Sequence, residues 1–109
     1  MSSDNPEFSE REIPVGKVPP NLLRRLVALA RTDDPAVVVP PGFGEDAAVL
    51  RTGARLIAVT SDPITFPTPR PGYFVVHINA NDIAVMGAKP RFATLTILLP
   101  PTATEAQAA

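Results

Sequence analysis

The pattern of apolar and polar positions predicts a first helix and a first short strand in the N-terminal half of the chain. Residues 22–30 carry one apolar stripe at helical spacing, with the arginines of this segment outside the stripe. Pro19-Pro20 suits the start of this helix, and Asp33-Asp34-Pro35 is expected to end it. Residues 37–39 are three valines, a short β-branched run that predicts a strand.

Further strands are expected downstream. Residues 47–50 predict a buried strand, residues 56–60 predict a second one, and Gly53 between them predicts a hairpin turn. Residues 91–99 alternate in part and predict a third, long strand that Pro100-Pro101 ends. The prolines lie between these elements, so they separate elements and do not indicate low complexity.

The most informative segment is a helix expected over residues 73–86 and closed by Gly87. It is apolar on nearly every side, which is typical of a buried helix. Its polar residues are His77, Asn79, Asn81 and Asp82. Because an unpaired buried carboxylate is costly, Asp82 is expected to face a cation, a cavity or strong donors. The alternative is that Asp82 caps a loop or pairs with an arginine, and His77 is expected to be a hydrogen-bonded core or rim residue.

Two other carboxylates lie at strand boundaries. Asp46 precedes strand 47–50, and Asp62 follows strand 56–60. Antiparallel neighbours would bring both to one end of the sheet. Three aspartates that converge there with Asp82, without clustered Lys or Arg, predict a hard-cation site, and magnesium in such sites commonly serves a nucleotide phosphate.

The turn Gly42-Phe43-Gly44 precedes Asp46. Its backbone N–H groups can approach a phosphate, although most Gly-x-Gly sequences are ordinary turns. Glu45 is expected to be a solvated neighbour of the site.

Composition narrows the class of protein. The chain has 109 residues, of which 45% are hydrophobic, enough for one small domain. Its formal net charge of −1 gives no reason to expect nucleic acid or a membrane as partner. Without cysteine, disulfides, zinc–thiolate sites and thiol catalysis are excluded. No signal-like or membrane-spanning stretch is found, so a cytoplasmic location is expected. The expected organisation is a flexible leader over residues 1–17, a domain over 18–101, and the start of a truncated helix over 102–109 with Thr104 as N-cap.

Three motifs resemble one superfamily, that of aminoimidazole ribonucleotide synthetase. They are Gly44-Glu45-Asp46-Ala47-Ala48-Val49, Thr60-Ser61-Asp62 and Asn81-Asp82-Ile83-Ala84-Val85-Met86-Gly87-Ala88-Lys89-Pro90. Relatives in it include thiamine-monophosphate kinase, selenophosphate synthetase and the hydrogenase-maturation carbamoyl dehydratase. The hydrogenase-maturation and synthase-related branch looks most similar, because Ala-Val-Met-Gly-Ala-Lys-Pro follows the Asn-Asp-Ile of the last motif.

The resemblance implies an α+β fold, a mixed or antiparallel sheet backed by helices, that pairs with a second copy in a homodimer. It implies ATP bound with Mg²⁺, and phosphoryl transfer or ATP-driven activation. The residues that match metal-binding acids are Asp46, Asp62 and Asp82. The residues that match nucleotide-binding positions are Gly44, Thr60, Ser61 and Asn81. Glu45 departs from the commoner aspartate at its position.

The chain lacks a later Gly-Gly-Asp motif, a larger C-terminal domain and the C-terminal cysteine of the dehydratase. The chain alone is therefore expected to be inactive, and a separate C-terminal domain is a possible partner. Two alternatives stay open: a nucleotide-binding or regulatory module without turnover, and a dimerisation module whose acids are structural remnants.

Overall fold

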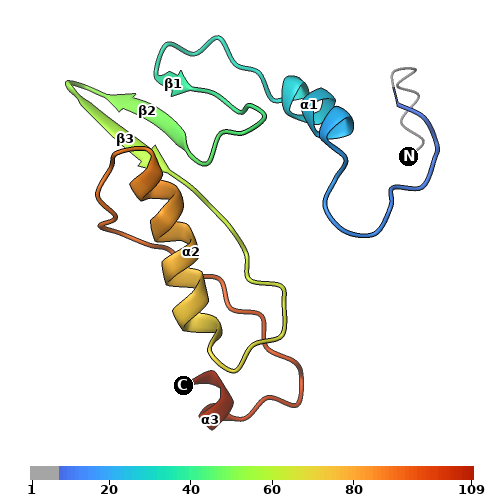
Figure 1. Ribbon diagram of the computed structural model, residues 1–109. Coiled ribbons are helices and arrows are strands. Elements are labelled where there is room, and N and C mark those ends of the chain that lie inside the picture. The colour runs from blue at the N-terminus through green and yellow to red at the C-terminus, as the bar shows by residue number, and fades with distance from the viewer. Residues whose placement is uncertain (1–7) are drawn as a thin grey trace.

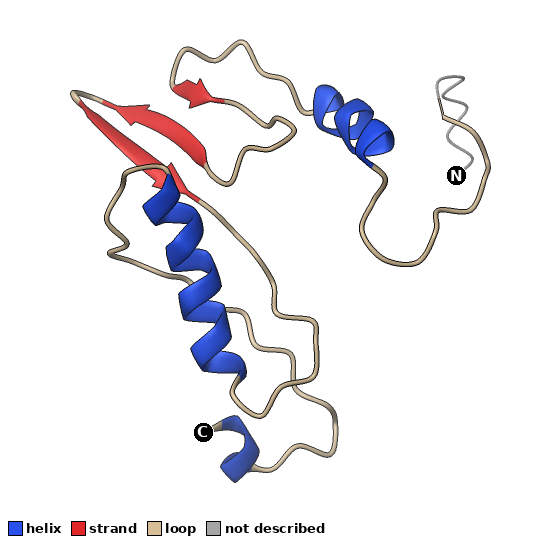
Figure 2. Cartoon of the chain, viewed as in Figure 1, coloured by secondary structure: helices blue, strands red, loops and turns tan. Residues whose placement is uncertain are grey.

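The computed structural model of the protein describes residues 8–109, which form a small α+β arrangement (Figure 1). In chain order the elements are α1 Pro20–Leu29, β1 Val37–Val39, β2 Ala48–Thr52, β3 Arg55–Val59, α2 Pro71–Val85 and α3 Glu105–Ala108. The α+β prediction is thereby confirmed, with the strands in one half of the described chain and the long helix α2 beside them (Figure 2). The predicted leader falls partly on residues 1–7, outside the described residues.

The sheet is a three-stranded antiparallel meander in the order β1-β2-β3. Strands β2 and β3 form a hairpin in which Ala48 pairs with Val59 and Thr52 with Arg55. The turn between them begins at Gly53, whose φ of +59° lies in the left-handed region that glycine adopts without strain. The predicted hairpin is therefore confirmed. The register shifts between Val37 and Val39, so β1 joins β2 irregularly.

Both longer helices begin at a proline, Pro20 in α1 and Pro71 in α2, where the missing N–H is not needed. The predicted closure of α2 at Gly87 is confirmed. Gly87 has a φ of +76°, its N–H donates to the Ala84 carbonyl at 2.9 Å, and the Ala88 N–H donates to the Ile83 carbonyl at 3.2 Å. This pair of bonds is the Schellman arrangement, which satisfies two helix-end carbonyls.

The C-terminal residues also follow the prediction. Thr104 caps α3, accepting from the Gln107 N–H, while the Gln107 side chain accepts from the Thr104 N–H. This reciprocal pair is a capping box. Among residues 8–109, no helix has both the length and the apolar character to cross a lipid bilayer.

The described chain leaves far more surface exposed than a closed domain of its size. Its accessible surface is 9744 Å², whereas a folded monomer of this mass exposes about 5,800 Å². Its radius of gyration is 17.6 Å, against about 13 Å for a compact domain. Within residues 8–109, Ala47 is the one buried residue, at 6% exposure. The elements are formed, but they enclose almost no core.

Two sequence predictions are corrected by this openness. Helix α2 is not buried: Val76 and Val85 are 55% and 66% exposed, because the sheet meets α2 only near the end of β3 (Figure 1). Residues 91–99 form no strand, and Phe92 is 90% exposed. A strand needs a neighbouring strand to accept and donate its backbone hydrogen bonds, and no strand in residues 8–109 pairs with this segment.

Candidate functional site

The end of the sheet opposite the Gly53 turn gathers the predicted acidic residues. Ala48 of β2 pairs with Val59 of β3, and continuing this register outward brings Asp46 opposite Ser61. The Thr60 hydroxyl donates to the Asp46 carbonyl at 2.9 Å, which closes this end of the hairpin. The prediction that Asp46 and Asp62 share one end of the sheet is confirmed.

Helix α2 joins this end through Asp82. The Thr60 hydroxyl also lies 3.4 Å from a carboxylate oxygen of the half-buried Asp82. A hydroxyl carries one proton, and O–H···O bonds are usually 2.5–3.0 Å long. The Asp46 carbonyl is therefore the main acceptor of the Thr60 proton. The Asp82 carboxylate is left with at most a weak bond from this hydroxyl, which suits a role toward a cation.

A second link to α2 holds Asp62. The Asn79 side-chain oxygen accepts from the Asp62 N–H at 2.8 Å, and its amide group donates to the Asp62 carbonyl at 3.0 Å. These contacts use only the main chain of Asp62. The last turns of α2 thus hold both Thr60 and Asp62, although the helix follows them in sequence by about twenty residues.

A groove of about 290 Å³ lies at this end of the sheet. Its lining residues are Val27, Pro40, Pro41, Gly42, Glu45, Asp46, Ala47, Ala48, Val59, Thr60 and Ser61. Ligand pockets usually measure about 300–1,000 Å³, so the groove by itself is small for a nucleotide. It contains Asp46, Thr60 and Ser61 of the predicted site and does not include Asp62 or Asp82.

The three aspartates are near one another in the fold without forming a closed ligand set. Among residues 8–109, no group of three or more His, Cys, Asp or Glu side chains is arranged to hold a metal ion. The donor chemistry nevertheless fits Mg²⁺, because carboxylate and carbonyl oxygens are its usual protein ligands. Asp46 and Asp62 are exposed, as is Asn81 on α2.

The Gly42-Phe43-Gly44 turn is built as the sequence predicts for a tight turn. Gly44 has a φ of +85°, and the Glu45 N–H donates to the Gly42 carbonyl at 3.3 Å. The left-handed conformation favours glycine at position 44. Glu45 is exposed, as expected for a solvated neighbour.

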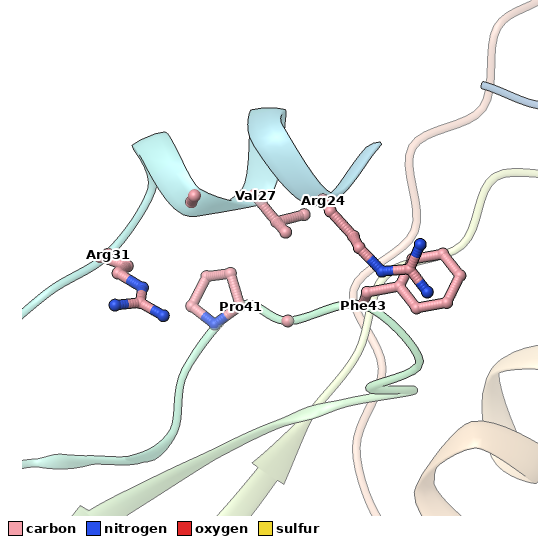
Figure 3. Close-up of a pocket in the computed structure, with 7 residues that line it drawn as sticks. Arg24, Val27, Arg31, Pro41 and Phe43 are labelled. Carbon is pink, nitrogen blue, oxygen red and sulfur yellow. The ribbon is translucent and has the colours of Figure 1, made fainter. Parts of the chain in front are cut away.

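Helix α1 reaches this turn through a contact that sequence reasoning missed. The Arg24 guanidinium lies 4.0 Å above the Phe43 ring, a cation–π arrangement. It borders a second groove of about 170 Å³, with Arg24 and Arg31 on opposite sides (Figure 3). Its lining residues are Arg24, Val27, Ala28, Arg31, Pro41, Gly42 and Phe43. In the sequence, the signal for this contact was the position of the arginines outside the apolar stripe. It did not identify the partner, Phe43, which lies beyond the helix.

The expectation for His77 is confirmed: it is an exposed, hydrogen-bonded residue. Its Nδ1 lies 2.8 Å from the Tyr73 carbonyl, and its ring stacks on Tyr73 with centroids 4.0 Å apart. Since a carbonyl only accepts, Nδ1 carries the proton in this contact.

The comparison with protein families agrees with this geometry. The model of the family "AIR synthase related protein, N-terminal domain" matches residues 44–109, which is 66 of the 109 residues. The chain belongs to this family. The matched region holds the aspartates, Asn79 and Asn81, and it leaves out α1. No curated protein and no solved structure matches the chain significantly.

Proposed function

We propose that this domain binds ATP with Mg²⁺ as part of an ATP-dependent enzyme that transfers a phosphoryl group or uses ATP for activation. The observation that carries the proposal is the junction of Asp46, Thr60 and Asp82, which joins two strands and a helix within the matched family domain. Within that family we propose the hydrogenase-maturation and synthase-related branch, on the motif that begins at Asn81-Asp82.

The chemistry of the junction suits a metal–nucleotide complex. The carboxylates of Asp46, Asp62 and Asp82 would hold Mg²⁺, with Thr60 and Ser61 beside it. The metal would neutralise phosphate charge, so the protein's task is mainly to position its ligands. The Gly44 turn and the Asn81 amide would contact phosphate oxygens.

The open surface supports a partner that completes the site, and we propose a second copy of the chain. The chain exposes roughly 3,900 Å² more than a closed monomer of its mass. Obligate homodimer interfaces bury about 2,000–5,000 Å² in total, or about 1,000–2,500 Å² per partner, so pairing with a second copy would cover a large part of this excess. A separate C-terminal domain is a second possible contributor to the cleft.

Calorimetry with ATP, with Mg²⁺ or with a chelator, tests the proposal. The wild-type chain should bind ATP more tightly with Mg²⁺, and the double variant Asp62→Asn/Asp82→Asn should lose that gain. The variant should keep its fold, or gain slight stability as carboxylate repulsion is removed. The matched control is Glu10→Gln/Asp33→Asn, two exposed acids outside the junction. Equal wild-type affinity with Mg²⁺ and with chelator contradicts the metal role.

Turnover assays and light scattering separate the related possibilities. Mg²⁺–ATP binding without hydrolysis would indicate a binding or regulatory module. A homodimer that binds no nucleotide would indicate a dimerisation module. A monomer throughout the micromolar range would contradict the proposed pairing.

A further inference from the structure

The side chain of Asn79, one of the polar residues in the second half of α2, is half-buried. A buried amide is unfavourable unless its donors and acceptor are satisfied. Asn79 accepts from the Asp62 N–H, and its amide nitrogen donates to two carbonyls, that of Asp62 at 3.0 Å and that of Val75 at 2.8 Å. Both amide protons and one acceptor site are thereby used, so the side chain is fixed in one orientation.

The partner of this amide is the main chain that carries a predicted metal ligand. Asn79 and Asp82 are three residues apart and face the same segment, Asn79 toward Asp62 and Asp82 toward Thr60. Three residues of a helix rise about 4.5 Å. The segment after β3 therefore runs antiparallel to α2 and is attached to it at two successive levels.

Asp62 depends on this attachment because the chain after it has no regular structure. Residues 60–70 belong to no helix or strand, and four prolines lie in residues 63–71. The hydrogen bond from the Arg70 N–H to the Thr68 hydroxyl is local to the far end of this loop. Without Asn79, the Asp62 carboxylate would be carried by a segment free to move relative to Asp82.

We propose that Asn79 is a positioning residue for the metal site: its amide fixes the Asp62 main chain so that the Asp62 carboxylate is pre-ordered for Mg²⁺. This inference rests on the proposed function. It deepens that function by assigning a role to a residue that is not itself a ligand. Residues that orient metal ligands typically change metal affinity about 10–100-fold when replaced.

The test is the Asn79→Asp variant, which keeps the size of the side chain but replaces the amide donor with an anionic oxygen facing two carbonyls. We expect the Mg²⁺ concentration needed for half-maximal ATP binding to rise about 10–100-fold. Saturating Mg²⁺ should restore the wild-type ATP affinity. Mn²⁺ affinity, followed by the electron-spin resonance of the free ion, should fall by a similar factor. The Asp62 amide proton should exchange faster with solvent.

The matched control is Thr68→Ala, which removes the hydroxyl that accepts from Arg70 and loosens the same loop without touching the Asp62–Asn79 contacts. It should leave the Mg²⁺ dependence within about twofold of wild type. If Asn79→Asp loses ATP binding at every Mg²⁺ concentration, or keeps the wild-type Mg²⁺ dependence, the positioning role is overturned while the proposed function stands. If wild-type ATP binding shows no Mg²⁺ dependence, the proposed function fails, and the inference fails with it.

Discussion

The end of the β2–β3 hairpin, where Asp46, Thr60 and Asp82 meet, and the more apolar segment of residues 91–99 differ strongly in order. At the hairpin end, Thr60, Asn79 and Asp82 join strands and helix by side-chain contacts of 2.8–3.4 Å. Residues 91–99 make no strand, and Ile97 and Leu98 are 68% and 89% exposed.

The difference shows which parts of this fold are local. The two strands of the hairpin are separated by a two-residue turn, so pairing them costs little loop-closure entropy. The later segment would have to find a distant strand edge. An apolar stretch left unpaired is a ready surface for another chain, as is the free edge of β3, which is consistent with the proposed second copy.

The largest expected effect comes from charging the unpaired segment. The double variant Leu95→Asp/Ile97→Asp should weaken the proposed homodimer at least 100-fold. Burying two large aliphatic side chains contributes about 3–6 kcal/mol, and carboxylates at the same positions would have to be desolvated. Sedimentation or light scattering across micromolar concentrations measures the change.

The control for this variant changes the alternate residues of the same segment, Thr94 and Thr96. Thr94→Asp/Thr96→Asp adds the same charge, but alternate residues of an extended chain point to opposite faces. We expect a much smaller change in dimer affinity. Equal weakening by both pairs would mean that net charge, and not one apolar face, governs association.

Local signals were enough to predict the elements whose ends are marked by particular residues. Gly53 marked the hairpin, Gly87 marked the end of α2, and Thr104 marked the cap of α3, each through a conformation or a bond formed with near neighbours. The common end for Asp46 and Asp62 followed from antiparallel pairing alone.

What the sequence did not predict depends on partners far along the chain. The sequence grouped Asn79 with its neighbours Asn81 and Asp82, while its partner in the structure is the main chain of Asp62, 17 residues earlier. The sequence placed Arg24 only outside the apolar stripe of its helix, while in the structure Phe43 lies under its guanidinium. The expected burial of α2 and the strand over 91–99 were wrong for the same reason: periodicity reports what a segment can pack against, not whether that partner is present.

A smaller effect is expected at Gly87, which joins the two compared regions. Gly87→Ala should lower the free energy of unfolding by about 1–2 kcal/mol, because a Cβ is unfavourable in the left-handed conformation. Its φ is +76°, and no atom lies within 4 Å of the added Cβ, so the effect would be conformational and not steric. Urea unfolding at a fixed protein concentration measures it.

Gly72 provides the comparison for that measurement. It lies in the first turn of α2, has no positive φ, and a Cβ there would also meet nothing within 4 Å. Gly72→Ala should therefore raise the free energy of unfolding by about 0.5–1 kcal/mol. Changes of the same sign in both variants would contradict the assignment of strain to the Gly87 conformation.

The smallest effect on stability is expected from removing the Arg24–Phe43 contact, which links the turn at the hairpin end to α1. Exposed cation–π pairs contribute about 0.5–1 kcal/mol, and this one attaches the turn that bears Gly44 to a helix outside the family match. A double-mutant cycle with Arg24→Met and Phe43→Leu should give a coupling energy of that size by urea unfolding.

Because the turn is proposed to contact phosphates, ATP affinity should also fall about two- to fivefold in each single variant. Arg25→Met is the matched control, since the Arg25 guanidinium lies 4.3 Å from the ring of Phe8 and should show no coupling to Phe43. A coupling energy of zero between Arg24 and Phe43, with unchanged ATP affinity, would contradict this prediction. The turn would then hold its conformation through Gly44 and the Glu45–Gly42 hydrogen bond alone, without a contribution from α1.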